Sequence, residues 1–365
     1  MDADAPSGKR GTAPGRGGAA QPTSRLATTA PANLATFNPR PHRADEAMRE
    51  VMLQVSAGRW VATHGSIADM TQAPMRGVLM VLLAALCWGT TGTAQSFAPP
   101  SLSAYWVGAL RLLVSAVFFA LVLGVTRRTS GLSQLPWRDV ALAGAGMAAY
   151  NLAFFAGVRS TGVAVGTAVA LGSGPIWAGL LQALGGLRPP LRWWIGTALA
   201  VAGGVLMVSG GDRSAAQPVS AVGLGLCLLA GLSYAVYALV NKRLVTAAAP
   251  PQVTFAVFTW ATLLALPLAW AMAGPVQLDL RDVAVVSYLG VVATGIAYLL
   301  FSHALRHISA ATGVTLALAE PVTAFVLAVL VLGERPGWLA AGGGLLVLAG
   351  LLVVVFAELR GSAAR

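Results

Sequence analysis

The chain has 365 residues, of which 56% are hydrophobic and only 10% are charged. Soluble globular proteins carry about 25% charged residues, so this composition, with a mean hydropathy of +0.72, excludes an ordinary water-soluble enzyme. In such a chain the net charge of +11 indicates basic loops at a membrane surface rather than a nucleic-acid partner.

Residues 1–74 are rich in Gly, Ala, Pro, Ser, Thr and Arg and contain no apolar run long enough for a secretory signal. We expect this tail to be disordered, because it has too little apolar surface to form a core. Met70 and Met75 directly precede the first apolar run, which suggests that translation starts at one of them. A peptide from residues 1–60 in the natural protein would refute that hypothesis.

Ten apolar runs follow the tail, and each is long enough to cross a hydrocarbon core of about 30 Å as a helix. The sequence therefore predicts an all-α membrane protein with ten transmembrane helices. Loops and the C-terminal tail on one side carry ten Lys and Arg residues and the loops on the other side carry four, which predicts that both termini are cytoplasmic. The runs span residues 77–97, 104–125, 138–157, 162–184, 192–210, 220–241, 252–273, 282–304, 309–332 and 337–357.

The two halves of the chain resemble each other, which predicts two five-helix repeats at 77–210 and 220–357. A shift of 146 residues aligns residues 82–88, which end at Trp88, with residues 228–234, which end at Tyr234. The same shift aligns Gly174-Pro175 with Glu320-Pro321. Because five is an odd number of spans, the second repeat must enter the membrane from the opposite side. Inverted repeats are typical of secondary transporters, whose substrate site lies where the halves meet.

Four short motifs carry a family resemblance: Cys87-Trp88-Gly89, Arg111, Glu320-Pro321 and the Leu-Gly-Glu-Arg run at 332–335. Together with the ten spans and the repeat, they resemble the EamA family of the drug/metabolite transporter superfamily. The resemblance implies a ten-helix inner-membrane carrier, commonly an exporter of amino acids or other small metabolites. The first repeat departs from the pattern, because Gly174 stands opposite Glu320, so a role that needs a carboxylate would depend on the second repeat alone.

The first and sixth spans each present a polar or aromatic stripe along one helical face. Aromatic rings with a few polar groups suit an amphipathic solute, so we expect these stripes to line a cavity; the alternative is contact between helices or with the membrane interface. The stripes are Trp88, Thr91 and Gln95 in the first span and Tyr234, Tyr237 and Asn241 in the sixth.

The third and eighth spans provide a second pair of faces, with Asn151 and Phe155 matching Tyr298 and Ser302 at a shift of 147 residues. Asn151 needs a hydrogen-bond partner within the bundle because lipid offers none. Substrate contact and a bond between helices are equally compatible with this pattern.

Two charged residues, Arg111 and Glu320, lie well inside spans, where ionisable groups are costly and usually functional. Glu320 could couple transport to a proton or bind a substrate ammonium. It could also form a structural ion pair with Arg111, or cap the helix at the proline break.

Pro175 and Pro321 occupy matched positions and predict interruptions of the fourth and ninth spans. Paired broken helices point to a transporter's binding site, so the neighbouring Ser173 joins the candidate substrate-binding residues. In the fifth span, Gly196, Ala200 and Gly204 form a face of small residues, which indicates close helix packing or a homodimer contact.

The sequence argues against an enzyme, because no nucleophile with a supporting base, paired aspartates or metal-binding cluster is evident in the spans. We expect no cofactor and no metal, and as partners a small-molecule substrate and the lipid bilayer. A passive channel would share the same spans. A carrier of nucleotide sugars or sugar phosphates is disfavoured, because its anionic substrates call for several basic cavity residues.

Overall fold

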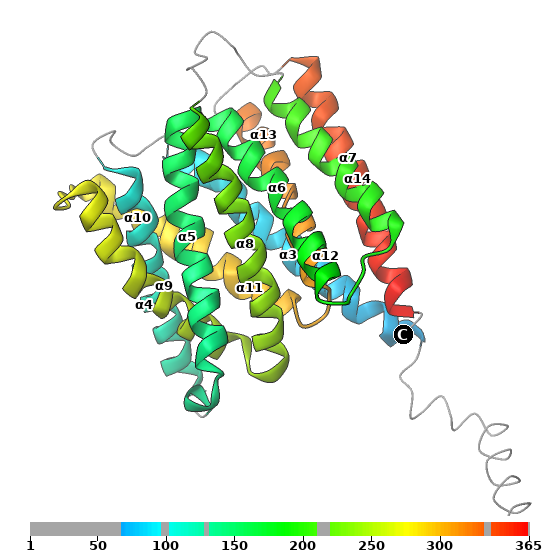
Figure 1. Ribbon diagram of the computed structural model, residues 1–365, viewed down its shortest axis with the longest axis horizontal. Helices are drawn as coiled ribbons and strands as arrows, with labels where there is room; N and C mark the ends of the chain where they lie inside the picture. Colours follow the sequence, from blue (N-terminus) through cyan, green and yellow to red (C-terminus); the bar gives the residue numbers. More distant parts are fainter. Residues whose placement is uncertain (1–66, 96–101, 128–130, 210–219, 332–336, 364–365) are drawn as a thin grey trace, which may run out of the picture. The chain divides into compact units, whose positions relative to one another are not determined.

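The computed structural model describes residues 67–95, 102–127, 131–209, 220–331 and 337–363 (Figure 1). The predicted disorder of residues 1–66, the side chain of Gln95 and the motif at 332–335 lie outside these described residues. Helix α3 begins at Ile67, so the end of the predicted tail is helical in the structure.

Within the described residues, ten helical spans are long and apolar enough to cross a membrane, which confirms the predicted all-α fold with ten spans. The eighth and ninth spans are each built from more than one helical segment. The first repeat contains α3 (Ile67–Gln95), α4 (Ala104–Thr126), α5 (Trp137–Thr161), α6 (Val163–Leu184) and α7 (Leu191–Ser209). The second contains α8 (Ala221–Ala247), α9 (Pro250–Ala273), α10 (Leu280–Gly290), a π-helix (Val291–Ile296), α11 (Ala297–Ala304), α12 (Ala310–Leu316), α13 (Ala319–Val331) and α14 (Trp338–Ala363).

The first span shows why these sequences need lipid around them. On α3, Leu79, Leu83 and Leu86 lie at helical spacing and are each at least half exposed. The opposite face buries small residues and Trp88 against the other helices. Large apolar groups outside and small or polar groups inside are the reverse of a water-soluble helix, so this outer face is suited to hydrocarbon.

Contacts between the repeats follow a pseudo-two-fold pattern. The third helix of each repeat packs against the first helix of the other, as α5 does with α8 and α11 with α3. The second helices, α4 and α9, pack against each other, and so do the last, α7 and α14. Figure 1 shows α7 and α14 side by side. This pairing is what two inverted copies of one five-helix unit produce.

Small residues bring α7 and α14 into close contact. A Cβ atom at Gly203 would lie 2.5 Å from the backbone nitrogen of Val347, and one at Gly196 would lie 2.8 Å from the carbonyl oxygen of Gly350. The predicted small face therefore packs within the chain, which leaves Gly196 and Ala200 buried rather than available to a second copy. Gly204 does not take part, because a Cβ there would meet nothing within 4 Å.

The two matched prolines have different effects. The ninth span is broken between α12 and α13, and Pro321 is the third residue of α13. The prediction that Pro175 interrupts the fourth span is wrong, because α6 is one helix from Val163 to Leu184 with Pro175 inside it. A first-turn proline loses no hydrogen bond, whereas Pro175 leaves one carbonyl of α6 without its usual partner and is tolerated among small neighbours.

Candidate functional site

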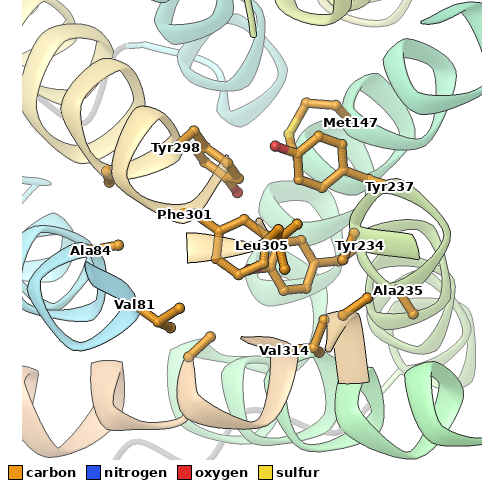
Figure 2. Packing of buried hydrophobic residues seen from close by; sticks show 14 of the residues in the cluster. Val81, Ala84, Met147, Tyr234, Ala235, Tyr237, Tyr298, Phe301, Leu305 and Val314 are labelled. Carbon is orange, nitrogen blue, oxygen red and sulfur yellow. The ribbon is translucent and has the colours of Figure 1, made fainter. Parts of the chain in front are cut away.

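Aromatic rings from both repeats meet in the middle of the bundle. Trp88 of α3 lies 5.1 Å from Tyr298 and 5.7 Å from Phe301 of α11, measured between ring centroids. Tyr234 of α8 lies 6.4 Å from Trp88. Figure 2 shows side chains of α8 and α11 turned toward each other at this point. We call the following residues the aromatic cluster: Trp88, Tyr150, Tyr234, Tyr237, Phe258, Tyr298 and Phe301.

The sequence analysis singled out four members of this cluster and missed three. Trp88, Tyr234 and Tyr237 come from the predicted stripes and Tyr298 from the predicted face of the eighth span, and the fold brings them together. The missed members are Tyr150, whose ring lies 5.1 Å from that of Tyr234, Phe258 and Phe301. Phe301 lies one helical turn after Tyr298, which is a signal that the sequence offered.

Several polar atoms in and around the cluster are buried without a hydrogen-bond partner among the described residues. They include the indole nitrogen of Trp88, the hydroxyl of Tyr234 and the side-chain carbonyl oxygens of Asn151 and Asn241. A buried polar group that lacks a partner costs about 1–3 kcal/mol. Such groups gathered in one place therefore point to a ligand or water that satisfies them.

The predicted amide and hydroxyl residues are partly engaged by the protein itself. The amide nitrogen of Asn151 donates to the carbonyl oxygen of Met147, one turn earlier on α5, at 3.0 Å. Asn241 donates to the hydroxyl of Ser302 at 3.0 Å, which links α8 to α11. Ser302 thus lies beside the cluster, in a bond between helices of the second repeat.

Thr91 and Ser173 stand apart from this network. Thr91 is half-buried on α3, and its hydroxyl forms no hydrogen bond with the described residues. Ser173 donates to the carbonyl oxygen of Ala170 at 3.3 Å, within its own helix. It also packs against α8, because a Cβ at Gly231 would overlap its hydroxyl oxygen. Its neighbour Gly174 is closer to the aromatic cluster, since a Cβ there would lie 3.9 Å from the ring of Tyr234.

Arg111 of α4 is buried, and its partners are neutral. Its Nε donates to the hydroxyl of Thr294 at 2.8 Å, and an Nη donates to the carbonyl oxygen of Ala293 at 3.4 Å. Both acceptors belong to the π-helix of the eighth span, which the sequence did not predict. The guanidinium also lies over the ring of Phe155, at 5.6 Å from its centroid. Short π-helical turns often occur at functional sites.

Glu320 is in the first turn of α13, next to the break in the ninth span. Its carbonyl oxygen lies against α3, because a Cβ at Gly89 would be 3.0 Å from it. Electrostatic interactions connect Glu320 with Arg111, Tyr150 and Tyr234, which puts it beside the aromatic cluster.

The structural ion pair between Glu320 and Arg111 is not formed. Within the described part of the chain, the Glu320 carboxylate has no hydrogen bond or ion pair, while Arg111 is held by Thr294 and Ala293. The reason is that the π-helix brings the hydroxyl of Thr294 and the carbonyl oxygen of Ala293 to the guanidinium. Two opposite charges thus share one buried region of the bundle without neutralising each other by contact.

Comparison with known proteins agrees with this architecture. The sequence matches the EamA-like transporter family twice, over residues 75–209 and 221–356. It is 39% identical over 280 residues to the uncharacterized transporter YwfM of Bacillus subtilis (strain 168), covering 76% of this chain and 92% of that protein. An uncharacterized protein of Pseudomonas aeruginosa is 29% identical over 259 residues, covering 70% of this chain and 85% of its own length.

One solved crystal structure shares the fold, with a TM-score of 0.66 and 20% sequence identity over 78% of this chain and 98% of the other. The family matches cover both repeats, and the named relative is a transporter rather than an enzyme. With ten membrane-spanning helices in two five-helix repeats, the chain belongs to the EamA-like transporter family.

Proposed function

We propose that this protein is a secondary transporter that exports amino acids or other small amphipathic metabolites or drugs by alternating access. The observation that carries the proposal is the aromatic cluster, which lies between the repeats and contains buried polar atoms without partners among the described residues. A pocket with an aromatic wall and a few orienting polar groups suits a small solute with one apolar part. Each repeat, 77–210 or 220–357, contributes part of that wall.

The charges of the buried Arg111 and the half-buried Glu320 limit the class of substrate that the site would accept. Arg111 and Glu320 lie in the same region and are not paired with each other. An intramembrane charge is costly unless a counter-charge meets it, so a zwitterionic or cationic solute would complement Glu320, and a substrate carboxylate would complement Arg111. A nucleotide sugar or sugar phosphate would need more cations than this single arginine.

We assign the proposed roles as follows. Glu320 couples transport to a proton or binds the substrate ammonium, and Arg111 holds the opposite end of the site. The break before Pro321 allows α12 and α13 to move separately, whereas Pro175 would only bend α6. The substrate-binding residues in this proposal are Trp88, Thr91, Asn151, Ser173, Tyr234, Tyr237, Tyr298 and Ser302.

The location follows from the same proposal. Basic residues are concentrated in the loops at one end of the bundle, which supports a plasma membrane orientation with both termini in the cytoplasm. Export then requires that the site open alternately to each side by a rocking motion of the repeats.

The test begins with spent medium from strains that overexpress or lack the protein, compared by metabolite profiling. A metabolite whose export depends on the protein is then measured with purified full-length protein in proteoliposomes. A carrier gives saturable flux and counterflow of labelled substrate. A passive channel gives flux without counterflow, and an unchanged medium with no saturable flux would refute export of common metabolites.

A matched pair of variants tests whether the measured flux depends on the aromatic cluster. Trp88→Phe changes the cluster, and Trp260→Phe changes a tryptophan that is 41% exposed on the outside of α9. We expect the first to alter the substrate KM or the rate and the second to leave both unchanged. Equal effects from both variants would argue against the cluster as the substrate site.

A further inference from the structure

A second cavity lies at one end of the bundle, away from the aromatic cluster. Its volume is about 760 Å³, and it lies where α6, α8 and α14 end and where α7 and α12 begin. This volume is within the range of about 300–1,000 Å³ that small-molecule sites occupy. The charge distribution predicts that this end of the protein is cytoplasmic.

The lining of this cavity is strongly basic. Arg188 comes from the loop between α6 and α7, Lys242 and Arg243 from the end of α8, and His307 from the loop between α11 and α12. We call this cavity the basic pocket. Among its described lining residues, the only acid is Glu358 of α14.

Glu358 is already engaged by the protein. Its carboxylate accepts hydrogen bonds from the backbone nitrogen of Ser309 at 2.9 Å and from the Ser309 hydroxyl at 3.1 Å. It also accepts one from the hydroxyl of Thr312 at 2.5 Å. These bonds hold the start of α12. The negative charge of Glu358 therefore faces the N-cap of α12 and does not pair with the arginines of the pocket.

Two of these cations have no partner among the described residues. The guanidinium groups of Arg188 and Arg243 form no hydrogen bond or ion pair with residues in the described ranges. Lys242 is partly engaged, because its Nζ donates to the carbonyl oxygen of Leu305. Burial lowers the pKa of His307, and the nearby charges of Arg306, Lys242 and Arg76 lower it further, which shows that the surroundings of this imidazole are positive.

We propose that the basic pocket binds an anionic phosphate group, carried by a phospholipid headgroup or by a small soluble phosphate. Arginine recognises phosphate oxygens through two parallel hydrogen bonds. Basic pockets between transmembrane helices on the cytoplasmic side are also suited to anionic lipid headgroups. The proposal is independent of the transported substrate, because none of the pocket residues belongs to the aromatic cluster.

Binding at this place has a consequence for the conformation of the protein. Arg188 belongs to the first repeat, and Arg243 and His307 belong to the second. A phosphate that contacts both repeats binds best to the arrangement that brings these residues together. It therefore stabilises that arrangement relative to states in which the repeats have moved apart at this end.

The experiment uses purified full-length protein in nanodiscs of phosphatidylcholine, with or without phosphatidylglycerol, and measures thermal unfolding. A third arm adds glycerol 3-phosphate to protein in pure phosphatidylcholine. Native mass spectrometry of protein released from the mixed discs counts the retained phosphatidylglycerol. The pocket variant is R188Q/R243Q. The control is R127Q/R138Q, which removes the same charge from exposed positions at the same end but outside the pocket.

We expect the wild type and the control to be stabilised by at least one phosphate probe, and the pocket variant to bind that probe about tenfold more weakly or worse. The control should stay within about twofold of the wild type. If only phosphatidylglycerol stabilises the protein, the pocket is a site for lipid headgroups. If only glycerol 3-phosphate does so, the pocket is a site for soluble phosphates. If both do so, the pocket accepts either kind of phosphate.

Two results would overturn the proposal. One is a pocket variant that responds like the wild type in every arm, and the other is a wild type that responds to neither probe. If R188Q/R243Q does not fold in phosphatidylcholine, the single variant Arg188→Gln replaces it, because this residue lies in an exposed loop. Transport failure in the separate flux assay does not bear on these outcomes.

Discussion

The fourth and ninth spans occupy equivalent places in the two repeats, yet they have different structures. At the matched position, the first repeat has Gly174-Pro175 inside the continuous helix α6. The second has Glu320-Pro321 in the first turn of α13, directly after a break. A repeated sequence therefore preserves the packing scheme while only one copy keeps a charged group at the centre.

The reason for the difference lies in the neighbouring helices. The short helix α12 is anchored at its start by other elements, since the backbone nitrogen of Ala311 donates to Gln182 of α6 at 3.2 Å and Ser309 binds Glu358 of α14. The equivalent helix start in the first repeat, at Val163, has no side-chain cap. Fixing one end of α12 allows the chain to turn at Ala317 and Leu318 and to begin a new helix with Glu320.

The largest effect on transport should come from Glu320→Gln. This variant removes the charge from the second repeat at the position where the first repeat has the uncharged Gly174. We expect transport to fall about tenfold or more, which corresponds to losing one charge-assisted interaction. Folding should persist, because the carboxylate has no protein hydrogen bond in the described residues to lose. Flux in proteoliposomes across a pH series, with unfolding temperature measured in parallel, checks both expectations.

The matched control is Gly174→Ala in the first repeat. The nearest atom to the added methyl group would be a side-chain carbon of Val314 at 3.5 Å, an ordinary van der Waals distance. Transport should remain close to that of the wild type. Normal transport by Glu320→Gln at every pH would remove the proposed coupling role and the contrast between the two spans.

The next largest effect, on stability, concerns α7 and α14, the last helices of the two repeats, which pack against each other. Gly203→Val should cost about 1–3 kcal/mol of stability, because its side chain would collide with the backbone of α14 at Val347 and Gly343. Gly204→Val should be nearly neutral, because a Cβ there meets nothing within 4 Å. Thermal unfolding in detergent compares the two, and equal losses would contradict the packing described here.

A smaller effect is expected for the anchor of α12. Glu358→Gln should cost about 1 kcal/mol, because the bonds from Ser309 and Thr312 lose their charged acceptor. Hydrogen exchange over residues 310–316 should become faster than in the wild type. Arg360→Gln on the same helix is the control. Unchanged hydrogen exchange in both variants would contradict the anchoring of α12 by Glu358.

The smallest effect is a gain in stability at the first helix of the second repeat. Tyr234→Phe removes a buried hydroxyl that has no partner among the described residues, so stability should rise by up to about 1 kcal/mol. Tyr288→Phe removes a hydroxyl that donates to Thr90 at 2.8 Å and should reduce stability slightly. A loss of stability in Tyr234→Phe would mean that the hydroxyl has a partner in the membrane-embedded protein.

The sequence singled out four of the seven residues of the aromatic cluster but predicted little of the hydrogen bonding around it. Four aromatic residues of the cluster were visible on predicted helical faces, because spacing along a helix decides which residues share a face. Tyr150 was missed, because its role depends on the approach of α8, which lies in the other repeat. The ion pair between Arg111 and Glu320, one of the alternatives that the sequence left open, is not formed for a similar reason, since the π-helix that holds Arg111 has no signal in hydropathy.

The sequence by itself determined that the solvent is lipid, that the chain crosses it ten times and that five spans are repeated. These properties depend on local apolar length, charge placement and self-similarity along one dimension. Only the tertiary structure decided which buried groups have partners, which of two matched prolines accompanies a break, and where basic residues surround a cavity. Those outcomes arise from contacts between residues far apart in the chain, where packing and hydrogen-bond geometry are set by neighbours that no local pattern records.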